Sequence, residues 1–337
     1  MYLSRSLFSM KTRLTSHSMT EVVVNQIRKA SQKMSFPINQ EKAKDIIDNV
    51  DNFLFDCDGV LWDGNGVIAG SLAVVLKLKQ LGKKVFYVTN NSSSSRQDYV
   101  KKCNDYGFPA EKDDIVCTAY IAAQYLHSIN FKDKVYLIGK EESIGHELDQ
   151  VGIRYFGPGP DPLIGTGYNQ WLKDIYLDAE VSCVLVGFDP HISFMKIMRA
   201  ASYLKNPDCL YIATNEDGSL PAKDSNICIP GTGCMVLPVT VAAERDPIVM
   251  GKPSTNMFDV LKKIHNLDPS RCMMTGDRIS TDITFAKTCG MRSLLVLSGI
   301  STINEICQPG QSPPKQANLQ NQPDLYAQNL AEFGKYI

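Results

Sequence analysis

The stretch Phe53–Val60, which reads FLFDCDGV, decides the fold, because an apolar run typical of a buried strand ends directly in two carboxylates, Asp56 and Asp58. Parallel α/β sheets place their ligands at this end of a strand. A carboxylate without a partner in an apolar interior would protonate or destabilise the fold, so the pair indicates a nearby cation or a set of backbone donors. Magnesium suits these acids best, because it prefers hard oxygen ligands and keeps several of its waters.

On both sides of this stretch, short β-rich runs alternate with longer amphipathic runs, as they do in a parallel sheet covered by helices. A strand at 52–55, a helix at 71–81 and a strand at 85–88 make one such unit. Strands restart after Cys117, and the short strands of the first unit resume beyond Pro247. The sequence therefore predicts an α/β fold, in which a doubly wound, Rossmann-like parallel-sheet core carries an inserted α/β domain. The later strands are expected at 135–138, 181–186, 210–213, 272–275 and 293–297, with helices at 141–151, 193–204 and 282–289.

Composition excludes several classes of protein. The 337 residues suit two domains, and the formal charge of −1 without a Lys/Arg run argues against nucleic-acid or membrane partners. The ten cysteines form no CxxC pair, which favours reduced thiols and a cytoplasmic protein. Mitochondrial targeting is the alternative, because residues 1–20 are basic, rich in Ser and Thr, and free of acids.

A second apolar run, Met273–Arg278, reads MMTGDR and again ends in an acid, Asp277. In a doubly wound sheet this acid can meet the pair at the end of the first strand, although it lies more than two hundred residues later. Asp282 lies just before a helical stretch, where an acid can be a simple helix N-cap.

Two further stretches predict a site for a phosphate dianion. Tyr87–Ser92 reads YVTNNS and ends a strand with Thr89, Asn90 and Asn91, whose hydroxyl, amides and backbone N–H groups can hold an anion. Lys252 lies in the turn GKPS and supplies one cation. Taken singly, each stretch also fits an ordinary polar loop or a solvated surface lysine.

In their order, these four stretches resemble the motifs of the haloacid dehalogenase superfamily, and over roughly residues 50–335 they resemble its phosphoglycolate and glycerol-3-phosphate phosphatase branch, related to pyridoxal phosphatase. The resemblance implies a catalytic core at 46–131 and 247–337, a cap domain at 132–246 and an N-terminal extension at 1–45. It also implies a homodimer through the cap.

The resemblance implies a role for each motif residue. Asp56 is the nucleophile that forms an aspartyl-phosphate, and Asp58 is the general acid and base. Mg²⁺ is held by Asp56, the Asp58 carbonyl and Asp277, with Asp282 behind them. A persistent phospho-switch of the receiver type is disfavoured, because such modules lack an acid at the position of Asp58. Cys57, between the two catalytic acids, is expected to be a small buried residue, with redox control as the alternative.

The expected substrate is a small phosphorylated metabolite, 2-phosphoglycolate or glycerol 3-phosphate. Pyridoxal phosphatases carry Tyr, Glu and His in place of Phe188, Pro190 and Leu220, so this chain is similar to the other branch. Ala222 and Lys223 depart from the branch's vertebrate-like pattern, and a pyridoxal phosphate or phosphoprotein phosphatase remains the alternative. His191 also fits a simple packing role. The residues expected to contact substrate from the cap are Phe188, Asp189, His191, Asn215 and Leu220.

Overall fold

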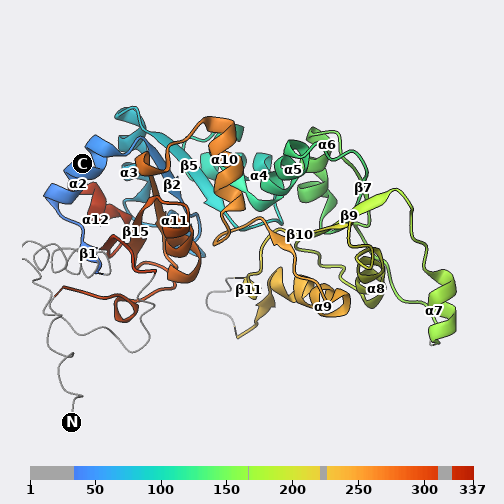
Figure 1. The fold of residues 1–337 in the computed structure, drawn as a ribbon. Coiled ribbons are helices and arrows are strands. Elements are labelled where there is room, and N and C mark those ends of the chain that lie inside the picture. Colours follow the sequence, from blue (N-terminus) through green and yellow to red (C-terminus); the bar gives the residue numbers. More distant parts are fainter. Residues whose placement is uncertain (1–33, 166, 221–225, 310–320) are drawn as a thin grey trace, which may run out of the picture.

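The structure, a computed structural model, describes residues 34–165, 167–220, 226–309 and 321–337. Two parallel sheets lie side by side (Figure 1). The larger has the strand order β1-β16-β15-β14-β2-β5-β6, and all its neighbouring pairs are parallel. Its strands are β1 (Phe36–Pro37), β2 (Asn52–Phe55), β5 (Lys84–Thr89), β6 (Ile115–Cys117), β14 (Cys272–Gly276), β15 (Arg292–Val296) and β16 (Leu325–Ala327).

The smaller sheet has the order β13-β10-β9-β7-β8 and is also parallel throughout. All five of its strands come from the chain between β6 and β14. Its strands are β7 (Lys134–Ile138), β8 (Arg154–Phe156), β9 (Val181–Val186), β10 (Leu210–Ala213) and β13 (Ile248–Val249). Two antiparallel hairpins complete the strands, β3 (Trp62–Asp63) with β4 (Gly66–Val67) and β11 (Ser219–Leu220) with β12 (Ile229–Pro230).

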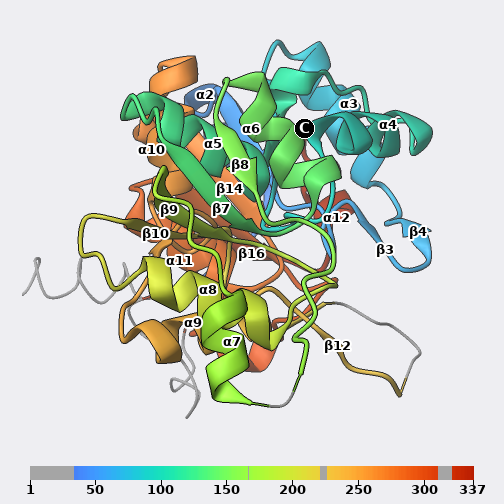
Figure 2. The ribbon, with the colours of Figure 1, turned by 90° about the vertical axis from the view of Figure 1, so that its right-hand side faces the viewer.

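Helices cover both faces of both sheets (Figures 1 and 2). They are α2 (Gln40–Asn49), α3 (Ser71–Gln80), α4 (Arg96–Asp105), α5 (Thr118–Ser128), α6 (His146–Gln150), α7 (Tyr168–Asp174), α8 (Phe194–Tyr203), α9 (Gly233–Ala243), α10 (Asn256–His265), α11 (Thr284–Thr288) and α12 (Leu330–Gly334). Single π-helical turns, Glu141–Gly145 and Ile279–Ile283, precede α6 and α11. Within the described ranges, every helix is too short or too polar to cross a bilayer.

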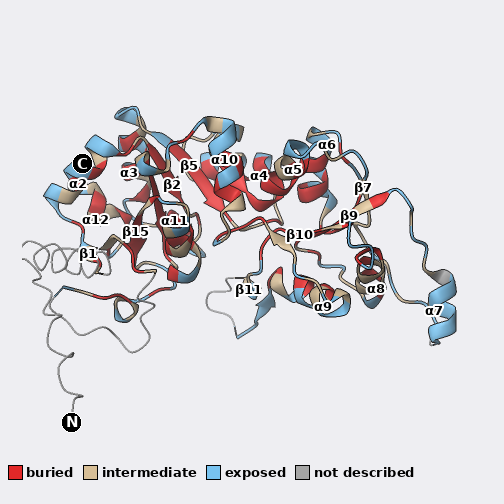
Figure 3. Ribbon diagram, viewed as in Figure 1, coloured by how far each residue is buried: buried red, intermediate tan, exposed pale blue. Residues whose placement is uncertain are grey.

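The central strands of both sheets are buried between these helices, whose outer faces are exposed (Figure 3). Along β2, Leu54 belongs to a core cluster shared with α5, α10 and α11, whereas Phe53 and Phe55 belong to the cluster on the opposite face, with α2, α3 and α12. The first of these clusters continues under the smaller sheet through residues of β7, β9 and β10. One apolar layer therefore joins the two sheets.

The predicted doubly wound parallel fold is confirmed, and β2, β9 and β10 begin and end where the sequence places them. Two strands fall outside the expected bounds of the core and of the inserted domain. The larger sheet takes in β1, with α2 packed on it, so the core begins before residue 46. Strand β13 pairs with β10, so the smaller sheet extends past residue 246. Both strands have only two residues, too few to show a periodic pattern.

The order of the larger sheet creates a switch point between β2 and β14. From β2 the chain moves to β5 and β6 on one side, whereas β14, β15 and β16 lie on the other side. Ligands of open α/β sheets bind at the carboxyl ends of the strands where the order reverses. Asp56 and Asp277, which follow β2 and β14, therefore share this position.

Candidate active site

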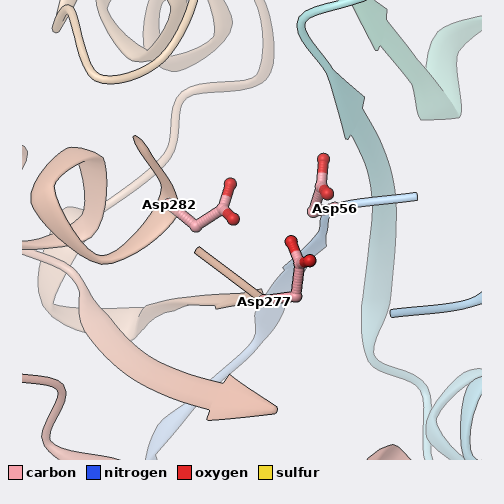
Figure 4. A group of neighbouring side chains, drawn as sticks. All are labelled: Asp56, Asp277 and Asp282. Carbon is pink, nitrogen blue, oxygen red and sulfur yellow. The ribbon is translucent and has the colours of Figure 1, made fainter. Parts of the chain in front are cut away.

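Three carboxylates converge at the switch point. Asp56 follows β2, Asp277 follows β14, and Asp282 comes from the π-helical turn before α11. One oxygen of each lies within 4.8 Å of the others, and the side chains face a common space (Figure 4). The sequence placed the first two together, and the structure adds Asp282 to the cluster itself.

Two glycines allow this close approach. A Cβ on Gly59 would lie 2.5 Å from Asp277 Oδ2, and one on Gly299 would lie 1.8 Å from the same oxygen. Gly59 also has a φ of +85°, a conformation that other residues rarely adopt. The glycine after Asp58 is therefore required both by the turn and by the carboxylate of Asp277.

Lys252 is the buried cation of this cluster. Its Nζ donates to Asp56 Oδ1 at 2.6 Å and to the Val88 carbonyl at 3.2 Å, and it lies 2.8 Å from Asp282 Oδ1. Burial lowers the pKa of Lys252, but the carboxylates of Asp282 and Asp56 outweigh burial and hold this pKa above its ordinary value. The ammonium therefore stays charged and is fully engaged by its neighbours.

One lysine does not balance three acids. Burial raises the pKa of Asp56 well above its ordinary value, against the pull of Lys252, and Asp282 and Asp277 raise it further. Burial and Asp282 raise the pKa of Asp277 to about 6. Asp282 Oδ1 is buried without a well-directed hydrogen bond. A cluster of hard oxygen donors with this charge imbalance fits a divalent cation such as Mg²⁺.

The predicted phosphate turn lies beside the cluster, and Asn90 ties it to Lys252. Asn90 Oδ1 accepts from the Lys252 N–H at 2.8 Å, and Asn90 Nδ2 donates to the Lys252 carbonyl at 2.9 Å. Thr89 Oγ1 accepts from the backbone N–H of Asn91 at 3.1 Å. The side chain of Asn90 therefore has a structural role, because its amide is hydrogen-bonded to the backbone of Lys252 and to Asp217.

The smaller sheet closes the site from the other side. The loop after β10 brings Asn215, whose Nδ2 donates to the Asn90 carbonyl at 2.7 Å, and Asp217, whose Oδ2 accepts from Asn90 Nδ2 at 3.1 Å. The space between the two sheets is a cavity of about 130 Å³, lined by both. It is lined by Asp56, Asp58, Thr89, Asn90, Asn91, Phe188, Asn215, Leu220, Lys252, Asp277 and Asp282, among others.

Comparison with known proteins identifies this arrangement. Residues 53–154 match the haloacid dehalogenase-like hydrolase family, and residues 249–333 match the HAD-hydrolase-like family. A glycerol-3-phosphate phosphatase of Gallus gallus is 41% identical over 298 residues, which are 87% of this chain and 94% of that protein. The chain belongs to the haloacid dehalogenase-like hydrolases.

Its relatives are phosphatases. Phosphoglycolate phosphatase 1A of Arabidopsis thaliana is 40% identical over 300 residues, which are 87% of this chain and 79% of that protein. The crystal structure of a 4-nitrophenylphosphatase from Thermotoga maritima superposes with a TM-score of 0.69 at 25% identity, covering 86% of this chain and 98% of that one. This haloacid dehalogenase-like hydrolase is therefore a phosphatase. Such phosphatases generally use Mg²⁺, for which the three acids are the fitting ligands.

In this hydrolase, Asp58 lines the cavity but stands outside the carboxylate cluster. Its Oδ1 accepts from Trp62 Nε1 at 3.0 Å and lies 3.8 Å from Lys102 Nζ. The carboxylate is close to half exposed. Asp58 is partly exposed on the cavity wall and is oriented by the indole N–H of Trp62, so it is suited to transfer protons between the cavity and solvent.

Two of the five residues expected to contact substrate from the cap lie outside the cavity. Asp189 is buried, pairs with Lys196 Nζ at 2.5 Å and accepts from the His191 backbone N–H at 2.8 Å. His191 is exposed. Both therefore shape the loop that carries Phe188, whose N–H donates to Ser92 Oγ at 3.1 Å. Sequence spacing could not reveal this, because the direction of each side chain in an irregular loop depends on what packs against it. Ala222 and Lys223 lie outside the described residues.

The structure also brings to the cavity residues that the sequence did not single out, although the loop from Asn215 to Pro221 as a whole was expected to contact the substrate. Asp217 lies in a stretch reading NEDG, which signals only a turn, and Arg278 directly follows Asp277. The remaining lining residues are Ser92, Ser93, Ser219, Thr232, Thr281 and Ile300. A polar turn directly after a parallel strand was the one available signal for Asp217.

The environment of Cys57 makes its thiol unreactive. It is fully buried in the cluster with Phe55 and Trp62. Burial and the charge of Asp56 raise the pKa of the Cys57 thiol well above its ordinary value. Oxidation requires an accessible thiolate, so this environment favours the packing role expected of the residue over redox control.

Proposed function

We propose that this phosphatase is a Mg²⁺-dependent phosphomonoester hydrolase that acts on small phosphorylated metabolites through a phospho-Asp56 intermediate. The observation that carries the proposal is the convergence of Asp56 with Lys252, Asp277 and Asp282 at one cavity. A bound Mg²⁺ would supply the positive charge that lets an anionic carboxylate approach a phosphate dianion.

The chain's own residues divide the reaction into two steps. First, an Asp56 carboxylate oxygen forms a bond to phosphorus while the bond from phosphorus to the leaving oxygen breaks, and Asp58 donates its proton to that oxygen. Next, Asp58 takes a proton from a water that attacks phosphorus, and Asp56 leaves as a carboxylate. Lys252 keeps Asp56 in place at 2.6 Å throughout.

The size of the cavity supports a small substrate. A cavity of about 130 Å³ accommodates a phosphate with two or three carbons more readily than an aromatic ring or a folded phosphoprotein. Relatives named for glycerol 3-phosphate and phosphoglycolate support the same class. We therefore propose 2-phosphoglycolate, glycerol 3-phosphate, or both as substrates, and pyridoxal 5′-phosphate as the weaker alternative.

A substrate panel tests this choice. With Mg²⁺ present, we expect kcat/KM for 2-phosphoglycolate or glycerol 3-phosphate to exceed that for pyridoxal 5′-phosphate by about tenfold or more, because misfit in a closed site is worth roughly 1–3 kcal/mol. Phosphate release gives the rates, and an identically purified Asp56→Asn protein corrects for contaminating phosphatases. Dominant turnover of pyridoxal 5′-phosphate would overturn the substrate class.

The Asp58→Asn variant tests proton transfer. Turnover of alkyl phosphates is expected to fall about 10²- to 10⁴-fold, because the leaving alkoxide and the attacking water both lose their proton partner. With 4-nitrophenyl phosphate, whose leaving group needs no proton, rapid-mixing measurements should show one equivalent of 4-nitrophenolate released quickly before slow turnover. A variant that slows that first release as much as it slows alkyl phosphates would assign Asp58 another role. Asp105→Asn, at an exposed ion pair with Lys101, is the matched control.

We further propose a cytoplasmic homodimer that assembles through the layer containing the smaller sheet. Exposed apolar side chains on α7 and α9, namely Tyr168, Leu172, Leu237 and Val241, support this surface. Light scattering of the purified protein tests the assembly, and a monomer at micromolar concentration would refute it.

A further inference from the structure

Arg278 is the second cation that lines the cavity within the described part of the chain, and unlike Lys252 it retains free donors. Its guanidinium is about one-third exposed and pairs with Asp217, with NH1 3.7 Å from Asp217 Oδ1. That distance makes an ion pair but is too long for a hydrogen bond. A planar donor group that faces a ligand cavity without hydrogen bonds is prepared to receive an anion.

The main chain of Arg278 is fixed. Its backbone N–H donates to Asp282 Oδ2 at 3.1 Å, directly beside the carboxylate cluster. The side chain extends from there to Asp217, in the loop of the smaller sheet. Arg278 therefore spans from the side of the cavity that would hold the phosphate to the side that faces the rest of the substrate.

Asp217 is fixed as well. Its carbonyl accepts from the Gly233 N–H at 2.9 Å, its N–H donates to Asn215 Oδ1 at 3.1 Å, and its Oδ2 accepts from Asn90. A Cβ on Gly231 would lie 2.2 Å from the Asp217 carbonyl, so the loop is packed tightly. The Oδ1 atom stays opposite the guanidinium, and its negative charge opposes any second anion that enters.

We propose that Arg278 is a specificity-determining residue that binds a carboxylate on the non-phosphate end of the substrate, while Asp217 holds the guanidinium in place and weakens that preference. The proposal rests on the proposed function of this site. It places a substrate such as 2-phosphoglycolate with its phosphate at Asp56 and its carboxylate on the Arg278 fork. A neutral hydroxyl at the same end would gain less from Arg278 and would meet no repulsion from Asp217.

Two probe substrates isolate the charge. 2-Phosphoglycolate and 2-hydroxyethyl phosphate have the same length and differ in carrying a carboxylate or a hydroxymethyl group. The measured quantity is the ratio of their kcat/KM values. Arg278→Gln is expected to lower the ratio of 2-phosphoglycolate to 2-hydroxyethyl phosphate by roughly ten- to a hundredfold, the usual value of a hydrogen bond between charged groups. Asp217→Asn keeps the acceptor for Asn90 and is expected to raise the ratio by about three- to tenfold, because it removes the opposing charge.

Opposite shifts in the two variants support the subsite. An unchanged ratio in Arg278→Gln, or an equal loss for both probes, overturns it, because an equal loss means that Arg278 acts on the phosphoryl group or on the nearby acids. Arg278→Lys, which keeps the charge but not the fork, should recover only part of the ratio. The midpoint of thermal unfolding of each variant, measured with and without Mg²⁺, shows whether the fold and the acidic cluster are intact.

A second readout separates this inference from the proposed function. Both probes are used as competitive inhibitors of 4-nitrophenyl phosphate hydrolysis, which requires neither of them to be turned over. If the wild type hydrolyses neither probe but Arg278→Gln shifts the ratio of inhibition constants as predicted, the substrate class is wrong and the subsite stands. If the wild type hydrolyses both and neither ratio moves in Arg278→Gln, the subsite is wrong and the proposed function stands.

Discussion

Replacing Asp56 by Asn is expected to lower kcat by about 10⁴-fold or more, because the amide cannot form the bond to phosphorus on which both steps depend. The substitution is nearly isosteric and leaves Lys252 paired with Asp282 at 2.8 Å. The loss should therefore be one of chemistry and not of folding. Phosphate release measures it, and circular dichroism with thermal unfolding verifies the fold.

The intermediate itself can be sought in the same experiment. Wild-type protein quenched in acid during turnover should carry a phosphoryl group on the peptide that contains Asp56, and the Asn variant should carry none. Asp105→Asn, which alters an exposed pair on α4, should behave as the wild type does. Steady turnover by purified Asp56→Asn would refute the assignment of the nucleophile.

Removal of divalent metal is expected to have the next largest effect. Excess EDTA should reduce phosphate release by about 10²-fold or more, and Mg²⁺ in excess of EDTA should restore it, because three clustered acids share one lysine. Asp277→Asn should raise the Mg²⁺ concentration needed for half-maximal activity, since it removes the negative charge of one of the three clustered carboxylates. Full activity in EDTA, with no response to added Mg²⁺, would contradict the metal site.

Stability gives a second measure of the same site. If Mg²⁺ binds the folded cluster and not the unfolded chain, a hundredfold excess of metal over Kd should increase the free energy of unfolding by about 2.7 kcal/mol. The midpoint of thermal unfolding should rise accordingly. The rise should be smaller in Asp277→Asn. A midpoint that Mg²⁺ leaves unmoved in the wild type would mean that the acids do not bind it.

The four motifs and the parallel core could be predicted from the sequence because each depends on local patterns. A buried strand that ends in an acid can be recognised at any position in the sequence, and the carboxyl ends of parallel strands must meet at one edge of the sheet. Asp56 and Asp277 could thus be placed together from the sequence, whereas Lys252 was expected at the site from its turn and from the resemblance. The short edge strands β1 and β13 were not predicted, because two residues are too few to show an alternating hydrophobic pattern. Only their pairing with neighbouring strands defines them.

Tertiary structure alone decided which polar residues of the smaller sheet face the cavity. Phe188 and Asp189 are neighbours in sequence, yet the first lines the cavity and the second is buried against Lys196. Asp217 and Arg278 lie in loops that follow strands of different sheets, and their side chains come within 3.7 Å of each other. The sequence by itself determines which chemical groups are present and which residues follow each strand. The direction of a loop side chain depends on long-range packing, and that packing places the guanidinium of Arg278 next to Asp217 in the cavity.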